Sequence, residues 1–218
     1  MGFFSSIKKA FGGGDGNTAH FFADEKTQRA TTDAVAREVA TQFQSPAIKL
    51  RDDGGEIHVT GTYRGRPARV TLDITFGGVT AEIKALAQDQ TFFMLMHDQT
   101  SAETYAASRV NRDQWDKDDD VFDELKVYVS KHVRYDGDSD EINERRAFWD
   151  ALPADLRGAI VAACEESQGT FLFSSGTISM KPWQGLLGRS DAAAVIRSHL
   201  DIATRAAEVI EAGLVRLR

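Results

Sequence analysis

The stretch EIHVTGTYRGRPARVTLDITFGGVTAEIKAL, residues 56–86, decides the fold class of this chain. At its start, the apolar side chains Ile57, Val59 and Tyr63 alternate with polar ones such as His58 and Thr60. A period of two is typical of a β-strand that buries one face and exposes the other to water. The pattern therefore predicts a strand with one core face.

The same alternation continues from Ala68 to Phe76 and resumes at Val79, with Gly77-Gly78 between the two runs. We expect the two glycines to form a two-residue hairpin turn, because such turns need positive φ angles. Arg64-Gly65-Arg66-Pro67 is the predicted tip of the hairpin before it. The whole stretch therefore predicts an antiparallel meander, whose apolar face needs a cover of helices or a second sheet.

Helical patterns flank this meander. They cover residues from about 23 to 43, Ala154–Ser167 behind Pro153, and a last helix that begins at Ser190 or Asp191 and ends at Gly213. A later hairpin is predicted to turn at Ser175-Gly176, with Phe171 and Phe173 facing Ile178 and Met180, and further strands at Phe92–Met96 and Leu125–Val129. The predicted fold class is α+β, an antiparallel sheet of a meander plus a later hairpin, covered by helices.

The composition indicates a globular protein. The 218 residues are 42% hydrophobic and 27% charged, and we expect one α+β domain over residues 18–218. A net charge of -7 disfavours nucleic acid as a partner. The single cysteine, Cys164, lies in an apolar run, and no run of about 18 apolar residues is present. We therefore expect a cytoplasmic protein, with a peripheral position at the inner membrane face as an alternative.

Residues 1–17 are predicted to form an arm, a short amphipathic N-terminal helix followed by a Gly-rich linker. Its apolar side and the two lysines beside it comprise Phe3, Phe4, Ile7, Phe11, Lys8 and Lys9. One alternative is an anchor whose aromatic rings enter the headgroup layer of a membrane surface while the lysines meet anionic lipid. The other is a helix that docks on its own domain or on a second subunit.

Three groups of residues are candidates for binding. Met94 and Met96 in the strand TFFMLMH, and Trp183, Leu186 and Leu187 in the loop at 182–188, would bind a protein partner if exposed and would fill or seal the core if buried. Arg64 and Arg66 at the hairpin tip are candidates for contact with an anion, although exposed arginines are common at such tips.

No catalytic residue, metal site or cofactor is predicted from a motif. The acidic run Asp113–Glu124 has the start of a calcium loop, but Val121 stands where glycine is needed and Val127 where the closing glutamate is needed. The run Asp136–Asp140 fails at the same positions. One enzyme alternative remains, in which folding brings His97 or His132 to the acidic loop around a divalent ion.

The predicted order of elements, reduced to helix, three strands, helix, two strands and helix, resembles the type III secretion chaperone-like fold over Asp24–Gly213. The resemblance implies a protein that binds protein partners, often as a dimer, without doing chemistry. The first hypothesis is therefore a non-catalytic cytoplasmic adaptor or chaperone-like module, with a homodimer as one form. A peripheral membrane protein and a metal-dependent enzyme are the alternatives.

Overall fold

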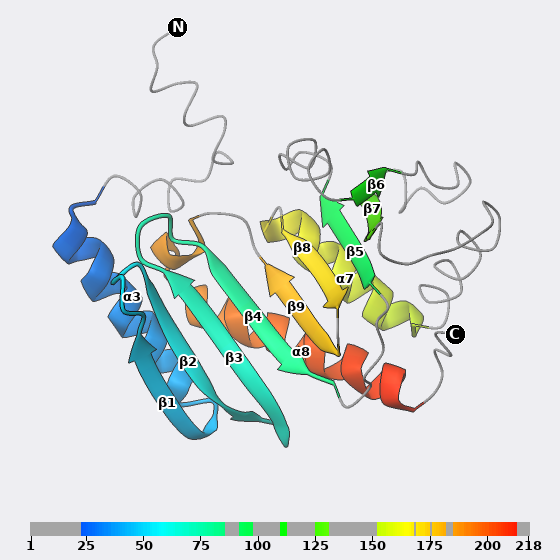
Figure 1. Cartoon of the computed structure of the whole chain (residues 1–218), viewed down its shortest axis with the longest axis horizontal. Helices are drawn as coiled ribbons and strands as arrows, with labels where there is room; N and C mark the ends of the chain where they lie inside the picture. Colours follow the sequence, from blue (N-terminus) through cyan, green and yellow to red (C-terminus); the bar gives the residue numbers. More distant parts are fainter. Residues whose placement is uncertain are drawn as a thin grey trace, which may run out of the picture. The chain divides into compact units, whose positions relative to one another are not determined.

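The computed structural model describes residues 23–85, 92–97, 110–112, 125–130, 152–167, 169–174, 176–181 and 185–212 (Figure 1). These fall into two compact units. The first comprises the chain up to Glu82 together with Lys181–Leu200, and the second comprises Ile83–Met180 together with the chain from Asp201 onward. The prediction of a single domain over 18–218 stays a prediction.

The first unit contains helix α3 (Glu25–Ala40) and four strands, followed by a short 3-10 helix, η1 (Leu186–Gly188), and the first part of helix α8 (Ala192–Glu211). The strands lie in the order β1 (Gln44–Leu50), β2 (Glu56–Tyr63), β3 (Arg66–Asp73) and β4 (Val79–Lys84), so each is next to its neighbour in sequence. β1 pairs with β2 and β2 with β3, both antiparallel. The predicted meander is confirmed.

The alternation along β2 and β3 places one row of side chains in the core. Ile57 pairs with Leu72 and Val59 with Val70, and these four are at most 2% exposed. Tyr63 at the end of the row is also buried. Helix α3 contacts β1, β2 and β3, and Figure 1 shows it behind β1 and β2.

The turns of the meander differ from each other. The tip between β2 and β3 is Arg64-Gly65, with positive φ at both residues (47° and 81°), as a two-residue hairpin turn requires. The expected strand up to Phe76 with a Gly77-Gly78 turn is wrong, because β3 already ends at Asp73. Asp73 Oδ1 accepts hydrogen bonds from the backbone N–H groups of Thr75 and Phe76, which turns the chain early.

The sequence does not predict strand β1, because the helical pattern runs to about Phe43 and Ser45-Pro46 follows it directly. Helix α3 begins after Asp24, whose side chain accepts a hydrogen bond from the Thr27 N–H, and ends at Ala40. Phe43 and Gln44 then cross closely over Gly61, where a Cβ would lie 2.9 Å from the Gln44 carbonyl oxygen. Glycine at position 61 therefore allows β1 to begin beside β2.

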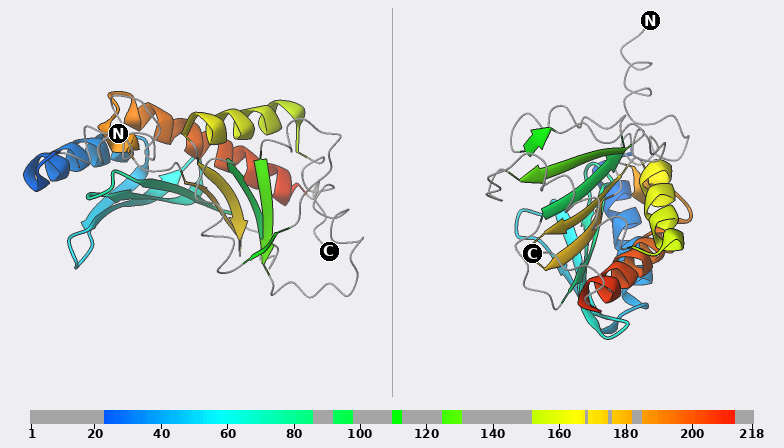
Figure 2. Two further views of the ribbon diagram at one scale, coloured as in Figure 1. Left: turned by 90° about the horizontal axis from the view of Figure 1, so that it is seen from above. Right: turned by 90° about the vertical axis from the view of Figure 1, so that its right-hand side faces the viewer.

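The second unit contains helix α7 (Ala154–Ser167), the rest of α8, and strands in the order β9 (Thr177–Lys181), β8 (Thr170–Ser174), β5 (Phe92–His97), β7 (Leu125–Ser130) and β6 (Val110–Arg112). α7 packs against β5 and β8, and Figure 2 shows these elements from two further directions. The bounds of α7 match the expectation, whereas β6 was not expected. The hairpin β8–β9 buries Phe171, Phe173, Ile178 and Met180 as predicted.

These two sets of strands and helices confirm the α+β class with an antiparallel sheet and helical cover. Cys164 is buried, as expected, and the Gly169 N–H donates to its carbonyl oxygen at 2.8 Å. His199 of α8 is also buried, at 2% exposed.

Candidate functional site

Two exposed apolar side chains mark the outer strand of the first unit. Among the large hydrophobic side chains that the structure describes, the exposed ones are Ile48 at 45%, Leu50 at 41% and Phe76 at 45%. Phe76 lies in a loop, whereas Ile48 and Leu50 lie two residues apart on β1 and therefore on one face. We call the segment Ala47–Leu50 the β1 edge.

The register of the sheet shows which face that is. Ile48 lies opposite Val59 and Leu50 opposite Ile57. Directly opposite residues of an antiparallel pair have their side chains on the same face. Because Val59 and Ile57 are 0% and 2% exposed, the apolar core row continues outward onto β1, where its cover stops.

The backbone of the β1 edge also faces outward. The Arg51 N–H donates to the Glu56 carbonyl oxygen at 2.9 Å, so the backbone groups of Arg51 point toward β2. Since these groups alternate in direction along a strand, those of Lys49 point the same way and those of Ile48 and Leu50 point away. β1 is the last strand in the order of the described strands, so the backbone N–H and C=O groups of Ile48 and Leu50 point away from the sheet at its unpaired edge.

The start of β1 limits how far this edge extends. The register shifts by one residue between Gln44 and Ala47, and Ser45 has a φ of 50°. This β-bulge and Pro46, which has no N–H to donate, are devices that restrict pairing at a sheet edge. The segment available for regular pairing is therefore short and well defined.

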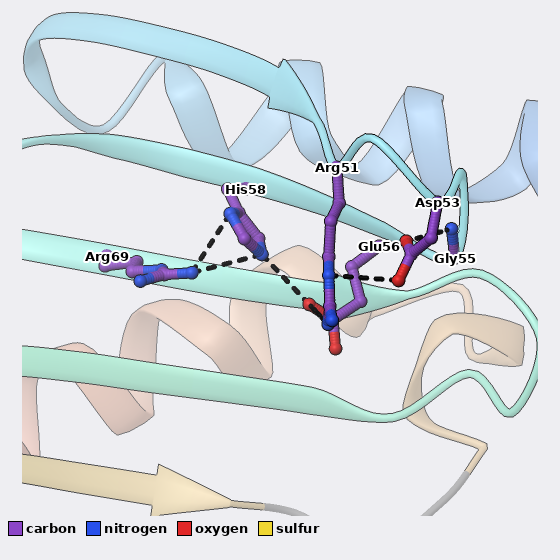
Figure 3. A network of polar contacts seen from close by, with 6 residues as sticks. All are labelled: Arg51, Asp53, Gly55, Glu56, His58 and Arg69. Atoms are coloured by element: carbon purple, nitrogen blue, oxygen red, sulfur yellow. Dashed lines mark hydrogen bonds and ion pairs between the residues drawn. The ribbon is translucent and has the colours of Figure 1, made fainter.

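A polar network lies on the opposite, open face of the sheet, beside the β1 edge (Figure 3). Arg51 Nε is 3.0 Å from Asp53 Oδ2, and Arg51 Nη1 is 3.2 Å from Glu56 Oε2. The His58 ring lies between Glu56 and Arg69, with Nε2 3.0 Å from Glu56 Oε2 and Nδ1 3.0 Å from Arg69 Nη2. The network therefore connects the β1–β2 turn with β2 and β3.

The charges in this network stabilise one another. The pKa of Glu56 is lowered from its ordinary value of 4.5, first by the hydrogen bond from His58 and then by Arg51. The hydrogen bond to Glu56, with the nearby charge of Asp53, raises the pKa of Arg51. The Asp53 carboxylate also accepts the Gly55 N–H at 3.0 Å, which orders the turn. The network therefore fixes the C-terminal end of β1.

The hydrogen bonds assign the His58 ring a tautomer. Glu56 can only accept, so Nε2 carries the proton and donates it, and Nδ1 then accepts from the Arg69 guanidinium. The 3.1 Å approach of Arg69 to Nε2 is then a contact only. The nitrogen that would act as a general base is thus occupied by Arg69, and the arrangement suits holding a strand in place more than moving a proton.

The predicted binding residues whose side chains the structure describes lie in two places, the 3-10 helix η1 and the tip between β2 and β3. Leu186 and Leu187 are 4% and 1% exposed, and the Leu187 N–H donates to the Gly77 carbonyl oxygen at 3.3 Å. Of the two alternatives for these leucines, burial supports the one in which they seal the core. Arg64 lies over the Tyr63 ring at 5.7 Å, and Arg66 begins β3 opposite Tyr63. Their contact with an anion stays a prediction.

The other sequence-based expectations fall outside what the structure describes. For Met94, Met96 and His97 only the backbone of β5 is described. The remaining candidates lie outside the described residues, namely Phe3, Phe4, Ile7, Lys8, Lys9, Phe11, His132, Trp183 and the acidic runs 113–124 and 136–140. Membrane docking, partner binding and a cation at those positions stay predictions.

The described segments contain neither a metal-binding cluster nor a membrane-spanning helix. Among them, no group of three or more His, Cys, Asp or Glu side chains has an arrangement that could hold a metal ion. No helix in the same segments combines the length and apolar character needed to cross a membrane.

The β1 edge has a sequence signal, although a short one. Ile48 and Leu50 alternate with Lys49 and Arg51, which is the pattern of a strand, but the run is only four residues long and directly follows a helix and Pro46. The network leaves no such signal. His58 and Arg69 belong to the polar rows of two predicted strands, but nothing in their spacing shows that they meet across those strands.

Comparison with known proteins gives one weak structural likeness. No protein-family model matches the sequence, and no curated protein sequence matches it. Among solved structures, the chain is similar to the crystal structure of the mycobacterial trehalose monomycolate transport factor A, TtfA, with a TM-score of 0.46 and 9% identity. The match covers 86% of this chain and 96% of that one. A likeness of this degree carries no argument about function.

Proposed function

We propose that this chain is a non-catalytic protein-binding module and that the β1 edge is its binding site. The carrying observation is the exposure of Ile48 and Leu50 on the same face as a fully buried apolar row. An apolar row that ends at an unpaired sheet edge supports an additional strand, since that strand would pair with the backbone and place its own apolar side chains beside Ile48 and Leu50.

Strand addition supplies affinity and specificity by different means. The outward N–H and C=O groups of Ile48 and Leu50 offer main-chain hydrogen bonds, which do not depend on the sequence of the partner. The two side chains offer an apolar surface that selects alternate apolar residues on an incoming strand. The side chain of Lys49 lies on the other face of the sheet, beside His58. It favours a partner strand that has no cation directly opposite it.

An adaptor or chaperone-like role in the cytoplasm is the finer form of this proposal. It rests on the acidic composition and on the resemblance in element order, together with the β1 edge. The polar network supports it indirectly, because a strand that receives a partner must be held in register by its own sheet.

Site-specific photo-crosslinking tests the proposal. A photo-reactive amino acid is placed at position 48 and, as a matched control, at Ala34, which is exposed on α3. After irradiation in living cells of the native host, we expect discrete protein adducts at position 48 that are absent at position 34. No adduct at position 48, or the same adducts at both positions, would overturn the assignment of the β1 edge as the binding site.

A further inference from the structure

We infer that the occupant of the β1 edge is the β1 edge of a second copy of this chain, paired antiparallel with Ile48 on the two-fold axis. The inference rests on the proposed function, because it names the partner of the same site. It follows from which backbone groups face outward and from which side chains each self-pairing would place opposite each other.

The two-fold axis can be placed at any of the four residues of the β1 edge, Ala47–Leu50. With the axis at Lys49, the two lysines lie opposite each other, and with the axis at Leu50, Lys49 lies opposite Arg51 of the second copy. Directly opposed like charges destabilise a strand pair. With the axis at Ile48, Lys49 lies opposite Ala47, and no charges are opposed. With the axis at Ala47, Lys49 would lie opposite Ser45 and no charges would be opposed, but Ile48 would lie opposite Pro46, which has no N–H. The axis at Ile48 is therefore the register that suits both the charges and the outward backbone groups.

The backbone supports the same register. The groups of Ile48 point outward, so two Ile48 residues on the axis exchange both of their hydrogen bonds, as residues of a hydrogen-bonded pair do. Leu50 then lies opposite Pro46 of the second copy and donates its N–H to the proline carbonyl oxygen. Pro46 has no N–H to return, and the bulge before it ends the ladder.

The apolar side chains complete this pairing. Ile48 and Leu50 of both copies would lie on one face of a sheet that continues across the axis, as an extension of the buried rows that contain Val59 and Ile57. The apolar side chains of the two copies would then pack beside one another across the axis and shield each other from water on that side. Because a short strand pair buries less than the roughly 1,200 Å² of a standard stable interface, we expect a dimer that dissociates on dilution.

Cysteine crosslinking tests the register. The only native cysteine, Cys164, is buried, so Ile48→Cys introduces one accessible thiol. In a hydrogen-bonded antiparallel pair the Cα atoms lie about 5.5 Å apart, which a disulfide can span. Lys49→Cys is the matched control, because position 49 is equally on β1 but offset from the axis and on the other face. Mild oxidation should yield disulfide dimers of Ile48→Cys and few of Lys49→Cys.

Sedimentation equilibrium provides an independent measurement. We expect the mass of the wild-type chain to rise with concentration from 24.0 kDa toward twice that value. Ile48→Lys should remain at the monomer mass, while Phe76→Lys, which changes an equally exposed side chain in a loop, should behave as the wild type. Circular dichroism checks that each variant is folded.

The outcomes separate the inference from the proposed function. A wild-type chain that stays monomeric at all concentrations, or a dimer lost in Phe76→Lys and kept in Ile48→Lys, overturns self-pairing. Equal disulfide yields at positions 48 and 49 also overturn it. If photo-adducts with a different protein still form at position 48, the proposed function stands without this inference. If no adducts form there at all, both are overturned.

Discussion

Two pairs of apolar side chains on one face of one sheet have opposite surroundings. Val59 and Ile57 on β2 are 0% and 2% exposed, while Ile48 and Leu50, directly opposite them on β1, are 45% and 41% exposed. The side chains are of the same chemical type, but β2 pairs with a strand on each side and, among the described strands, β1 pairs with β2 alone. Burial along this face therefore stops at the strand that has a neighbour on one side only.

Helix α3 explains where the cover stops. It packs against both β1 and β2, but its buried positions are Gln28, Thr32, Ala36, Val39 and Ala40. Val39 is the largest apolar side chain among them, and the others are small or polar. The polar ones are satisfied locally, since Thr32 Oγ1 donates to the Gln28 carbonyl oxygen at 2.8 Å and Gln28 Nε2 donates to the Thr75 carbonyl oxygen at 3.4 Å. Ile48 and Leu50 on β1 therefore remain exposed beside this helix.

The largest predicted effect separates the two rows. Ile57→Ala removes a fully buried side chain and should lower the free energy of unfolding by about 2–5 kcal/mol. Ile48→Ala removes the same atoms from a half-exposed position and should change it by only about 0.5 kcal/mol. Urea unfolding of both variants at low protein concentration measures the difference. Equal losses would contradict the assignment of Ile48 to an uncovered row.

A second prediction concerns how β1 is attached to β2. Gly61→Ala would place a Cβ 2.9 Å from the Gln44 carbonyl oxygen and 3.0 Å from the Phe43 Cβ, so the backbone must shift. We expect a loss of about 1–3 kcal/mol in the free energy of unfolding, measured by the same urea titration.

The matched control is Gly158→Ala, at an exposed position of α7 where a Cβ meets nothing within 4 Å. That variant should be more stable than the wild type by about 0.5–1 kcal/mol, because alanine favours the helix. If Gly61→Ala left the free energy of unfolding unchanged, Phe43 and Gln44 would not cross closely over position 61.

The sequence was sufficient for the covered row. The period of two in residues 56–63 and 66–73 locates the core face of β2 and β3, and Pro153 together with the apolar spacing locates α7. These signals are local, because each strand or helix carries its own pattern. The β1 edge has the same alternating pattern over only four residues. Because the end of a helix and Pro46 directly precede it, the pattern does not predict a strand on its own.

The network could not be predicted because it depends on register. Thr60 pairs with Arg69 and Thr71 with His58, so Arg69 and His58 are diagonal neighbours whose contact depends on the β2–β3 turn having two residues. The loop at 74–78 shows how one side chain changes such a register, since the carboxylate of Asp73 ended β3 before the expected glycine turn. Side-chain caps of this kind act over two or three residues and leave no periodic pattern.

A third prediction tests whether the network holds the β1 edge in place. Glu56 is 29% exposed, so Glu56→Gln should lower the free energy of unfolding at pH 7 by only about 0.5–1 kcal/mol. Because the pKa of Glu56 is lower in the folded chain than its ordinary 4.5, its stabilising contribution is present above pH 4.5 and is lost as the pH falls through the folded value. Urea titrations from pH 7 to pH 3 should therefore show the two chains converging.

The control for this experiment is Glu38→Gln, which removes an exposed carboxylate from α3. It separates the loss of one negative charge from the loss of the network. Hydrogen exchange at the Lys49 amide, whose group points toward β2, should also accelerate in Glu56→Gln and remain unchanged in Glu38→Gln. If exchange at Lys49 is the same in all three chains, the network does not stabilise β1.

The smallest expected effect is that of Arg69→Ala. Arg69 is exposed and contacts only the ring of His58 in this network, so we expect the free energy of unfolding to change by about 0.5 kcal/mol or less. The proton on His58 Nε2 should stay in place, because Glu56, held by Arg51, remains its acceptor. Nitrogen-15 NMR of the ring at neutral pH distinguishes the two tautomers. A switch to the Nδ1–H form, or a loss of more than about 1 kcal/mol in the free energy of unfolding, would mean that Arg69 orients the ring and that the Arg51–Glu56 pair does not. The attachment of β1 would then depend on β3 more than on the β1–β2 turn.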